Sequence, residues 1–212
     1  MNCGHFKEFR RGLLPLVSGV LFACVVMPGA AFAAACLGDT NPNLVRNGGF
    51  ESGIGTDIKH WTVAWDSTVD PYVYLDTTNP HSGAQDLAMG STRGANDITQ
   101  GIQGTVGGYV YTVCFWLYSS PNLSGGHTSF EILWNNVPEL ELINSARFGY
   151  EYYALNVLAQ GNAHDALKIR ERNYEGFYYL DDVAVQLCSG CGLAPDSDQH
   201  MRGKRLSEKS VE

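Results

Sequence analysis

Carboxylates are the first residues of this chain that could do chemistry, because glycoside hydrolysis needs two of them facing one cleft. Seven of the acidic residues in the central part of the chain are candidates, scattered over predicted strands and loops: Glu131, Glu139, Glu141, Glu151, Asp165, Glu171 and Glu175. Their spacing pairs none of them. A serine hydrolase of the nucleophile-elbow type would carry G-x-S-x-G, and that pattern does not occur in the sequence.

Histidines and glycine-rich loops give no stronger indication of catalysis. The histidines of the central part occupy separate turns and lack the spacing of a zinc site: His60, His81, His127 and His164. The sequence also has no phosphate loop and no dinucleotide fingerprint. We therefore predict that the protein is not an enzyme, with a small hydrolase as an alternative.

Aromatic residues favour a binding role, because sugar rings stack on flat apolar faces while their hydroxyls hydrogen-bond to polar side chains. Alternation along 109–118 places Trp116 and Tyr118 together on an outward face. If the strands shared one concave sheet, outward residues of other strands would complete a groove for a neutral glycan, and residues before His81 would rim it. The predicted ligand-binding residues are Trp65, Tyr72, Trp116, Tyr118, Glu131 and Arg170. For each of them the alternative is simple packing.

The elements that position these residues are predicted to be strands, because apolar and polar residues alternate with a period of two over five segments: 109–118, 129–136, 150–159, 166–172 and 177–187. Glycine-, proline- and asparagine-rich turns separate them. A short helix is possible over 137–147. Strands that recur without intervening helices indicate an all-β fold, a two-sheet antiparallel jelly-roll sandwich.

The two ends of the chain differ from this central part. Residues 1–33 combine a basic start, an apolar run and the Ala31-Phe32-Ala33 pattern of a secretory signal peptide. A membrane span and a lipid-modified Cys36 are the alternatives. The predicted domain covers 34–188, and the polar tail 189–212 is expected to be disordered. We therefore expect a secreted or periplasmic protein with no membrane anchor after cleavage.

Charge narrows the class of partner. Removal of 1–33 would take away three basic residues and one acidic residue, leaving 11 basic and 21 acidic ones and a net charge of −10. Such an acidic chain is a poor match for nucleic acid, which requires a basic surface. A neutral partner, such as a polysaccharide, or a divalent cation suits it better.

Four cysteines would remain in the exported chain: Cys36, Cys114, Cys188 and Cys191. An even number in an exported protein indicates disulfides. The simplest pairing ties the two ends of the domain together, Cys36 with Cys188. The alternative is a redox Cys-x-x-Cys motif at 188–191, although that motif normally opens a helix. The sequence assigns no partner to Cys114.

The order of motifs in the domain resembles the galactose-binding-like jelly-roll superfamily, near the family 4/9 carbohydrate-binding modules of the exported bacterial type. The motifs are NLVRNGGFESG at the start, HWTV, NPHSGAQDLAMG, ITQGIQGTVGGYVYTVCFWLY and a closing FYYLDDVAV. The resemblance implies two packed antiparallel sheets, adjacent chain ends and a carbohydrate-binding function. The alternative is a structural or adhesion module of the envelope or extracellular matrix that binds proteins. One departure is Glu171, where relatives usually carry an apolar residue.

The resemblance also implies a structural calcium ion where the first and last strands meet. Matching the motifs assigns its ligands to Gly49, Glu51, Ser82, Asp181 and Asp182. Asp181 is preferred because it has the same parity as the apolar residues that follow it. It would therefore point inward, where an uncompensated charge is costly and a cation with oxygen ligands removes that cost. The alternatives are that Glu51 only hydrogen-bonds a loop amide and that Asp182 is solvated.

Overall fold

The structure is a computed structural model that describes residues 36, 40–65, 72–91, 94–120, 127–161, 164–173 and 176–188. The predicted signal peptide, 1–33, and the predicted tail, 189–212, lie outside these residues. Within the described ranges every regular element is a strand. None of the described segments forms a helix long and apolar enough to span a membrane.

Twelve strands are described: β1 (Gly53–Ile54), β2 (Asp57–Ile58), β3 (Thr62–Ala64), β4 (Val73–Asp76), β5 (Asp86–Met89), β6 (Asn96–Gly101), β7 (Val110–Ser119), β8 (Ser129–Trp134), β9 (Val137–Ile143), β10 (Phe148–Leu158), β11 (Ala166–Arg172) and β12 (Tyr178–Leu187). All five strands predicted from alternation are present. The possible helix over 137–147 is wrong, because this segment pairs with β8 as the edge strand β9.

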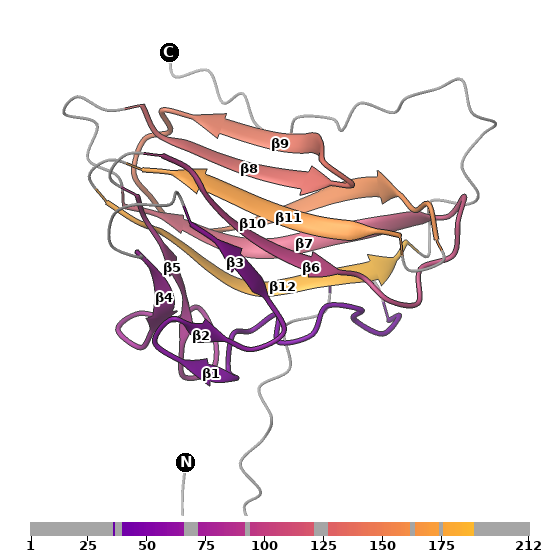
Figure 1. Ribbon diagram of the computed structural model, residues 1–212, viewed down its shortest axis with the longest axis horizontal. Helices are drawn as coiled ribbons and strands as arrows, with labels where there is room; N and C mark the ends of the chain where they lie inside the picture. Colours follow the sequence, from indigo (N-terminus) through magenta and orange to yellow (C-terminus); the bar gives the residue numbers. More distant parts are fainter. Residues whose placement is uncertain are drawn as a thin grey trace, which may run out of the picture. The chain divides into compact units, whose positions relative to one another are not determined.

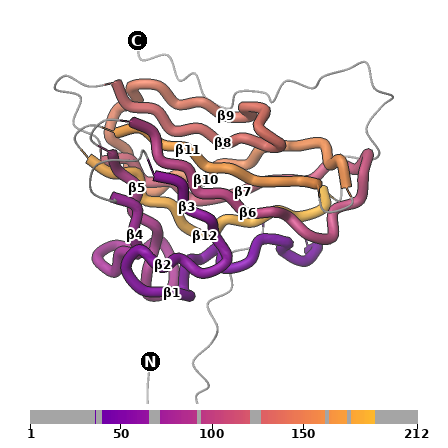
Figure 2. The backbone as a smooth tube through the Cα atoms, viewed as in Figure 1, coloured from indigo at the N-terminus to yellow at the C-terminus, as the bar shows by residue number. Residues whose placement is uncertain are grey.

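Two five-stranded antiparallel sheets form the sandwich that Figures 1 and 2 show. One has the order β10-β7-β12-β5-β4 and the other β3-β6-β11-β8-β9, while β1 and β2 form a separate hairpin. The predicted jelly-roll β-sandwich is therefore confirmed. We call the sheet that contains β7 the β7 sheet and the sheet that contains β11 the β11 sheet.

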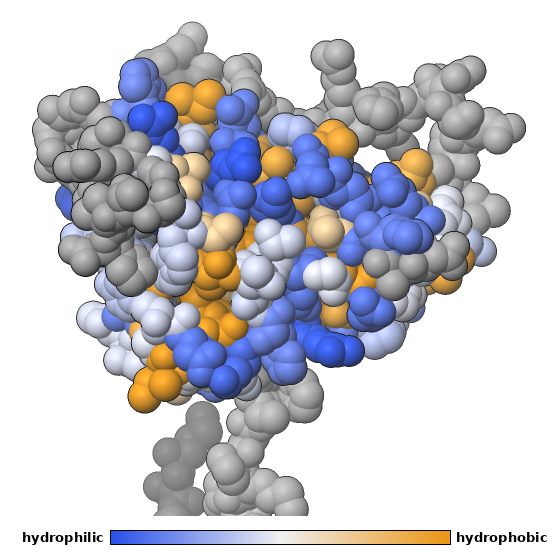
Figure 3. All heavy atoms as spheres, in the orientation of Figure 1, coloured by the Kyte–Doolittle hydropathy of each residue, from blue (hydrophilic) through white to orange (hydrophobic). Residues whose placement is uncertain are grey.

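The core lies between the sheets and follows the predicted alternation. Val113, Phe115 and Leu117 of β7 are buried against Phe130 and Ile132 of β8. Trp61 and Trp134, which the sequence assigns to the core, are indeed buried. The outer side of each sheet is left for polar and aromatic residues. Figure 3 shows one face of the molecule, on which hydrophilic residues predominate and apolar residues form scattered patches.

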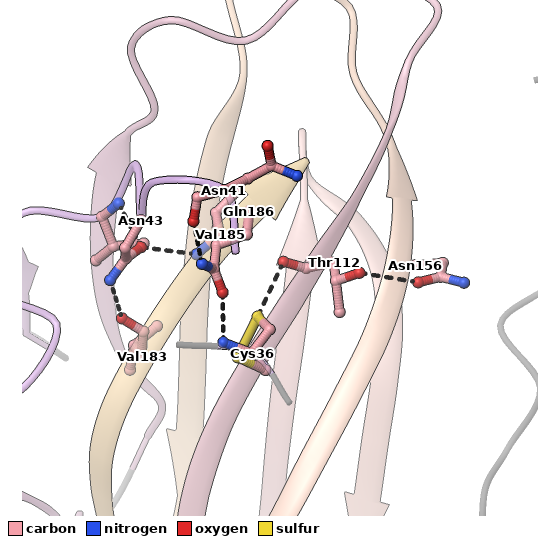
Figure 4. The surroundings of a disulfide bond; sticks show 10 residues. Cys36, Asn41, Asn43, Thr112, Asn156, Val183, Val185 and Gln186 are labelled. Carbon is pink, nitrogen blue, oxygen red and sulfur yellow. Dashed lines mark hydrogen bonds between the residues drawn. A yellow bond between two sulfur atoms is a disulfide. The ribbon is translucent and has the colours of Figure 1, made fainter. Parts of the chain in front are cut away.

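The opening segment lies beside the closing strand, as the resemblance implies. The Leu44 amide donates to the Val185 carbonyl at 2.9 Å, and the Val183 amide donates to the Gly48 carbonyl at 2.9 Å. The Asn43 side chain bonds Val183 and Val185 as well (Figure 4). The opening segment thus continues the edge of β12 at the point where pairing with β5 ends.

The predicted disulfide between Cys36 and Cys188 is wrong. Cys36 is bonded to Cys114, with their Cα atoms 5.7 Å apart, which is a normal separation for a disulfide. Cys188 is disulfide-bonded too. The physical reason is the outward parity of Cys114 on β7, which places its side chain beside Ala184 of β12, in the same cluster as Cys36.

Candidate functional site

A group of aromatic side chains covers the outer side of the β7 sheet. Cross-strand partners lie on the same face of a sheet, and the pairing places Tyr74, Ala88, Tyr179 and Tyr118 in one row across four strands. A neighbouring row contains Asp181, Trp116 and Tyr152. We call this surface the aromatic face; its members, all half-buried, are Tyr72, Tyr74, Trp116, Tyr118, Tyr150, Tyr152, Phe177 and Tyr179.

The rings of the aromatic face contact one another in a continuous chain. Tyr118 lies 5.4 Å from Tyr179 and 5.7 Å from Tyr150, measured between ring centroids. Phe177 lies 5.7 Å from Tyr74, over the backbone of β5, where a Cβ added to Gly90 would come within 2.9 Å of the Phe177 ring. Close packing fixes these rings, and a rigid aromatic surface loses little entropy when it binds a ligand.

His81 joins this face from a turn. Its imidazole stacks on the indole of Trp116, with ring centroids 4.0 Å apart and an interplanar angle of 17°. It also meets Tyr150 edge-on at 5.2 Å. One side of the Trp116 ring is therefore already covered, and a ligand would meet the His81 ring together with the exposed part of the indole.

A β-bulge in β12 brings two carboxylates to the turn that carries His81. The register shifts between Asp181 and Ala184, and Asp182 adopts a positive φ of 52°. The prediction that Asp181 points into the core is therefore wrong: its cross-strand partner is Trp116, on the outer side, and the bulge resets the parity before Val183. Asp181 is nevertheless buried, because the turn covers it.

Three acids hold this turn through hydrogen bonds. The Ser82 amide donates to Asp181 Oδ2 at 2.9 Å, and the Ser82 hydroxyl donates to Asp182 Oδ1 at 2.8 Å. Asp182 Oδ2 lies 2.8 Å from His81 Nδ1.

Glu51 Oε1 accepts from the amides of Ala84, at 2.8 Å, and Gln85, at 3.3 Å. Glu51 thus bonds loop amides, which leaves open its predicted role as a calcium ligand, whereas the alternative in which Asp182 is solvated is wrong, since Asp182 is 1% exposed.

The pKa of Asp181 is raised to about 8, chiefly by burial; the hydrogen bonds from the amides of Ser82 and Asp182 oppose the rise, and the neighbouring carboxylates of Asp182 and Asp86 add to it. Atoms of His81, Asp181 and Asp182 that could bind a metal ion lie within 4.8 Å of one another. The site thus gathers negative charge that either a proton or a cation must compensate.

The opening turn reaches this site by a backbone path that differs from the expected one. Gly48 and Gly49 are buried, but the positive φ values belong to Asn47, at 53°, and Phe50, at 55°. Phe50 is held by stacking on Trp61, with centroids 5.7 Å apart. A left-handed phenylalanine is uncommon, and here it directs Glu51 back toward the 81–85 turn.

The six predicted ligand-binding residues do not form one groove. Tyr72, Trp116 and Tyr118 belong to the aromatic face, whereas Glu131 and Arg170 lie on the outer side of the β11 sheet. Trp65 follows β3, an edge strand of that second sheet, and is 38% exposed. The error is physical: parity says that a side chain points outward, but not from which of the two sheets.

Arg170 and Glu131 have a local role in the β11 sheet. The Arg170 guanidinium donates to Asp97 Oδ1 at 2.8 Å and to Oδ2 at 3.0 Å, across the β6–β11 pair. Burial raises the pKa of Glu131, the opposing Arg170 lowers it, and the nearby carboxylates of Glu141 and Asp97 raise it. These residues form a charged cross-strand cluster rather than part of an aromatic platform.

Asp86, Tyr150 and His81 are site residues that the sequence reasoning did not identify. Asp86 of β5 is fully buried and accepts a hydrogen bond from the Tyr150 hydroxyl at 2.5 Å. The pKa of Asp86 is raised to about 6, chiefly by burial; the hydrogen bond from Tyr150 opposes the rise, and the Asp76 carboxylate adds to it. The QDLAM stretch alternates polar Asp86 with apolar Leu87, so its parity could have placed Asp86 outward had β5 been identified as a strand.

No protein-family model matches the chain, and no curated protein has a similar sequence. Among solved structures, the enzymatically active domain of tailspike protein 4 from bacteriophage CBA120 has a TM-score of 0.50 and 19% identity over 69% of this chain. The chain spans only 21% of that domain's length.

Smaller binding domains also match at lower scores. The carbohydrate-binding module TmCBM61, solved with β-1,4-galactotriose, has a TM-score of 0.48 and 17% identity, covering 69% of this chain and 99% of that module. The CBM22-1 xylan-binding domain of Xyn10C from Paenibacillus barcinonensis has a TM-score of 0.46 and 12% identity, covering 69% and 95%. None of these identities exceeds 19%, so the similarity concerns the fold alone, and the sheet order of the chain itself establishes a two-sheet antiparallel jelly-roll sandwich.

Proposed function

We propose that this protein is an exported, non-catalytic carbohydrate-binding β-sandwich whose aromatic face holds the glycan. The observation that carries the proposal is the aromatic face itself: eight half-buried aromatic side chains gathered on one side of the β7 sheet, fixed by mutual ring contacts. Contiguous aromatic side chains on the outer side of a sheet are typical of a binding surface. Sugar rings offer the apolar C–H faces that stack on such rings, and the tyrosine hydroxyls supply hydrogen bonds.

Trp116→Ala tests the location of the binding site. The substitution should weaken glycan binding about tenfold or more, since one stacked aromatic contact is worth on the order of 1 kcal/mol and His81 loses its support as well. Binding would be measured by calorimetry with a hexasaccharide selected from a glycan array. The melting temperature should change by only a few degrees, because Trp116 is half-buried outside the core.

Trp65→Ala is the matched control, since Trp65 is an exposed tryptophan that follows a strand of the β11 sheet. Its substitution should leave the affinity unchanged. Unchanged affinity in Trp116→Ala would reject the aromatic face as the binding site. If no glycan on the array binds, the structural or adhesion function becomes the better explanation, with a protein as the partner of this face.

A structural calcium ion is the second part of the proposal. The residues present fit such an ion, because Asp181 and Asp182 are buried neighbours and Glu51 is bound to the same turn. Calcium prefers oxygen ligands, so these carboxylates, with the carbonyls of Gly49 and Ser82, would hold it. The imidazole of His81 would remain a hydrogen-bond partner of Asp182. Bound calcium would keep Asp181 ionised, which burial alone opposes.

Calcium removal provides a direct test. We expect added calcium to raise the melting temperature of chelator-treated protein by several degrees, because an ion that binds only the folded state stabilises it. Asp181→Asn should melt close to the chelated wild-type protein, since the buried amide needs no countercharge, and should not respond to calcium. A wild-type melting temperature that is equal with chelator and with calcium contradicts a structural calcium ion.

Export is the third part of the proposal. It is supported by the Ala31-Phe32-Ala33 pattern and by the Cys36–Cys114 disulfide, because disulfides persist in oxidising compartments. The location would be secreted or periplasmic.

A further inference from the structure

We infer that the aromatic face selects glycans that carry protonated amino groups over neutral and uronic acid glycans. This inference rests on the proposed glycan-binding function of the same face and specifies its ligand. It depends on Asp76 and Asp86, which lie opposite each other on β4 and β5, on the same outer side as the tyrosines. Neither residue is among the proposed calcium ligands.

Asp86 is the main observation. It is 0% exposed, and its Oδ1 has no hydrogen-bond partner, whereas Oδ2 accepts from Tyr150. A buried carboxylate oxygen without a donor is costly. A ligand that brings a positive charge to the face would compensate this charge, and a hydroxyl would do so less well.

The aromatic side chains around these acids favour the same kind of ligand. Tyr74 is two residues from Asp76 on β4, and Tyr150 bonds Asp86 directly. Tyr118 and Tyr179 continue the row. Electron-rich ring faces attract ammonium groups, and a carboxylate beside them adds a Coulombic term. Tyrosine rings combined with carboxylates are therefore suited to a cation and oppose an anion.

The lysine and arginine residues of the described strands all lie on β11, which supports this preference. On the outer side of the β11 sheet, Lys168 and Arg170 provide positive charge and pair with Asp97. On the aromatic face, by contrast, the described members of the rows include no lysine or arginine. Arg147 approaches only the end of the face, where its Nε donates to the Ser120 carbonyl. The remaining basic side chain described on this face, His81, is bonded to Asp182, so a uronate would find little there to neutralise it.

Calorimetry with three defined oligosaccharides tests this selectivity: glucosamine hexamer, N-acetylglucosamine hexamer and galacturonate hexamer. In a near-neutral buffer, where Asp86 is ionised and a fraction of the amines is protonated, the glucosamine hexamer should bind about tenfold more tightly than the acetylated one, as expected for one cation–π contact plus one ion pair. Galacturonate should bind most weakly. The preference should shrink at high salt, because the exposed part of the interaction is screened.

Asp76→Asn tests the residues without disturbing the core, since Asp76 lies on the edge strand β4 and is half-buried. It should remove most of the preference for the glucosamine hexamer. Glu141→Gln, the same loss of charge on the exposed edge of the β11 sheet, should retain it. Equal affinity for the amine and acetyl forms, or tightest binding of galacturonate, overturns the inference while leaving glycan binding intact. Absence of binding to any glycan instead rejects the proposed function.

Discussion

Asp165→Ala is expected to destabilise the fold by about 4 kcal/mol, the cost typical of breaking a buried, hydrogen-bonded charge network. Asp165 is 1% exposed and accepts four hydrogen bonds of 2.7–2.8 Å: from the Thr105 hydroxyl, the Asn135 amide group, and the backbone amides of Gln160 and Gly161. Alanine would leave four donors without their acceptor. Because these donors come from three separate loops, the whole end of the sandwich would loosen.

Denaturant unfolding measures this effect. Asp57→Ala, the loss of an exposed carboxylate, is the control and should change the free energy of unfolding by less than about 1 kcal/mol. A change of similar size in both variants would contradict the network. Burial alone would raise the pKa of Asp165, but the four hydrogen bonds hold it below its ordinary value. The stabilisation is therefore present above the unfolded-state pKa and is lost as the pH falls through the lower folded-state value.

The strands and the core residues could be predicted from the sequence, because alternate residues of a half-buried strand are apolar and buried. The alternation placed Phe115 inside and Trp116 outside on β7, and both assignments are confirmed. The resemblance also placed the opening and closing segments side by side, which their backbone hydrogen bonds confirm.

The candidate site was less predictable, for reasons that are local. The bulge at Asp182 adds a residue to β12 and reverses the parity before it, so counting from Val183 placed Asp181 on the wrong side of the sheet. The alternation along a strand also does not tell which sheet the strand joins. Arg170 and Trp116 were therefore predicted to line one groove, although they lie on different sheets. The partner of Cys114 required the path of the opening segment over the β7 sheet, which no pattern in the sequence encodes.

At Glu171 this chain carries an acid where the family that it resembles usually has an apolar residue, and the structure shows the consequence. Strand β11 does not end before it, and Glu171 is 0% exposed on the inward side, opposite Phe130. Its Oε1 accepts from the Asn96 amide group at 2.9 Å, while Oε2 has no partner. The sandwich core therefore contains an acid that is poorly compensated when ionised.

Glu171→Gln should make the protein more stable at alkaline pH and remove a large pH dependence. Burial raises the pKa of Glu171 from 4.5 to about 8, and the bond from Asn96 only partly opposes this rise. Between these two values the folded state keeps a proton that the unfolded state releases. The stability contribution of protonated Glu171 is thus fully present below the unfolded-state pKa, and it is lost as the pH rises through the folded-state pKa.

The size of the loss is on the order of 5 kcal/mol across that range, at roughly 1.4 kcal/mol per pKa unit. Unfolding free energies of wild type and Glu171→Gln would be compared at several values from mildly acidic to mildly alkaline pH. The glutamine retains an acceptor for Asn96, so the two proteins should have similar stability in acid and diverge as the pH rises. Asp86 and Asp181 also have raised pKa values, but they are common to both proteins and cancel in the difference.

Glu141→Gln is the matched control, because Glu141 is an exposed glutamate of the edge strand β9. Its stability should follow that of the wild type at every pH. Parallel curves for wild type and Glu171→Gln would mean that Glu171 is ionised in the folded state at neutral pH, and a compensating cation or water would then have to lie beside Oε2. A curve for Glu171→Gln that rises relative to wild type between the unfolded-state and folded-state pKa values and then levels off instead identifies the buried carboxyl as the proton-binding group of the core.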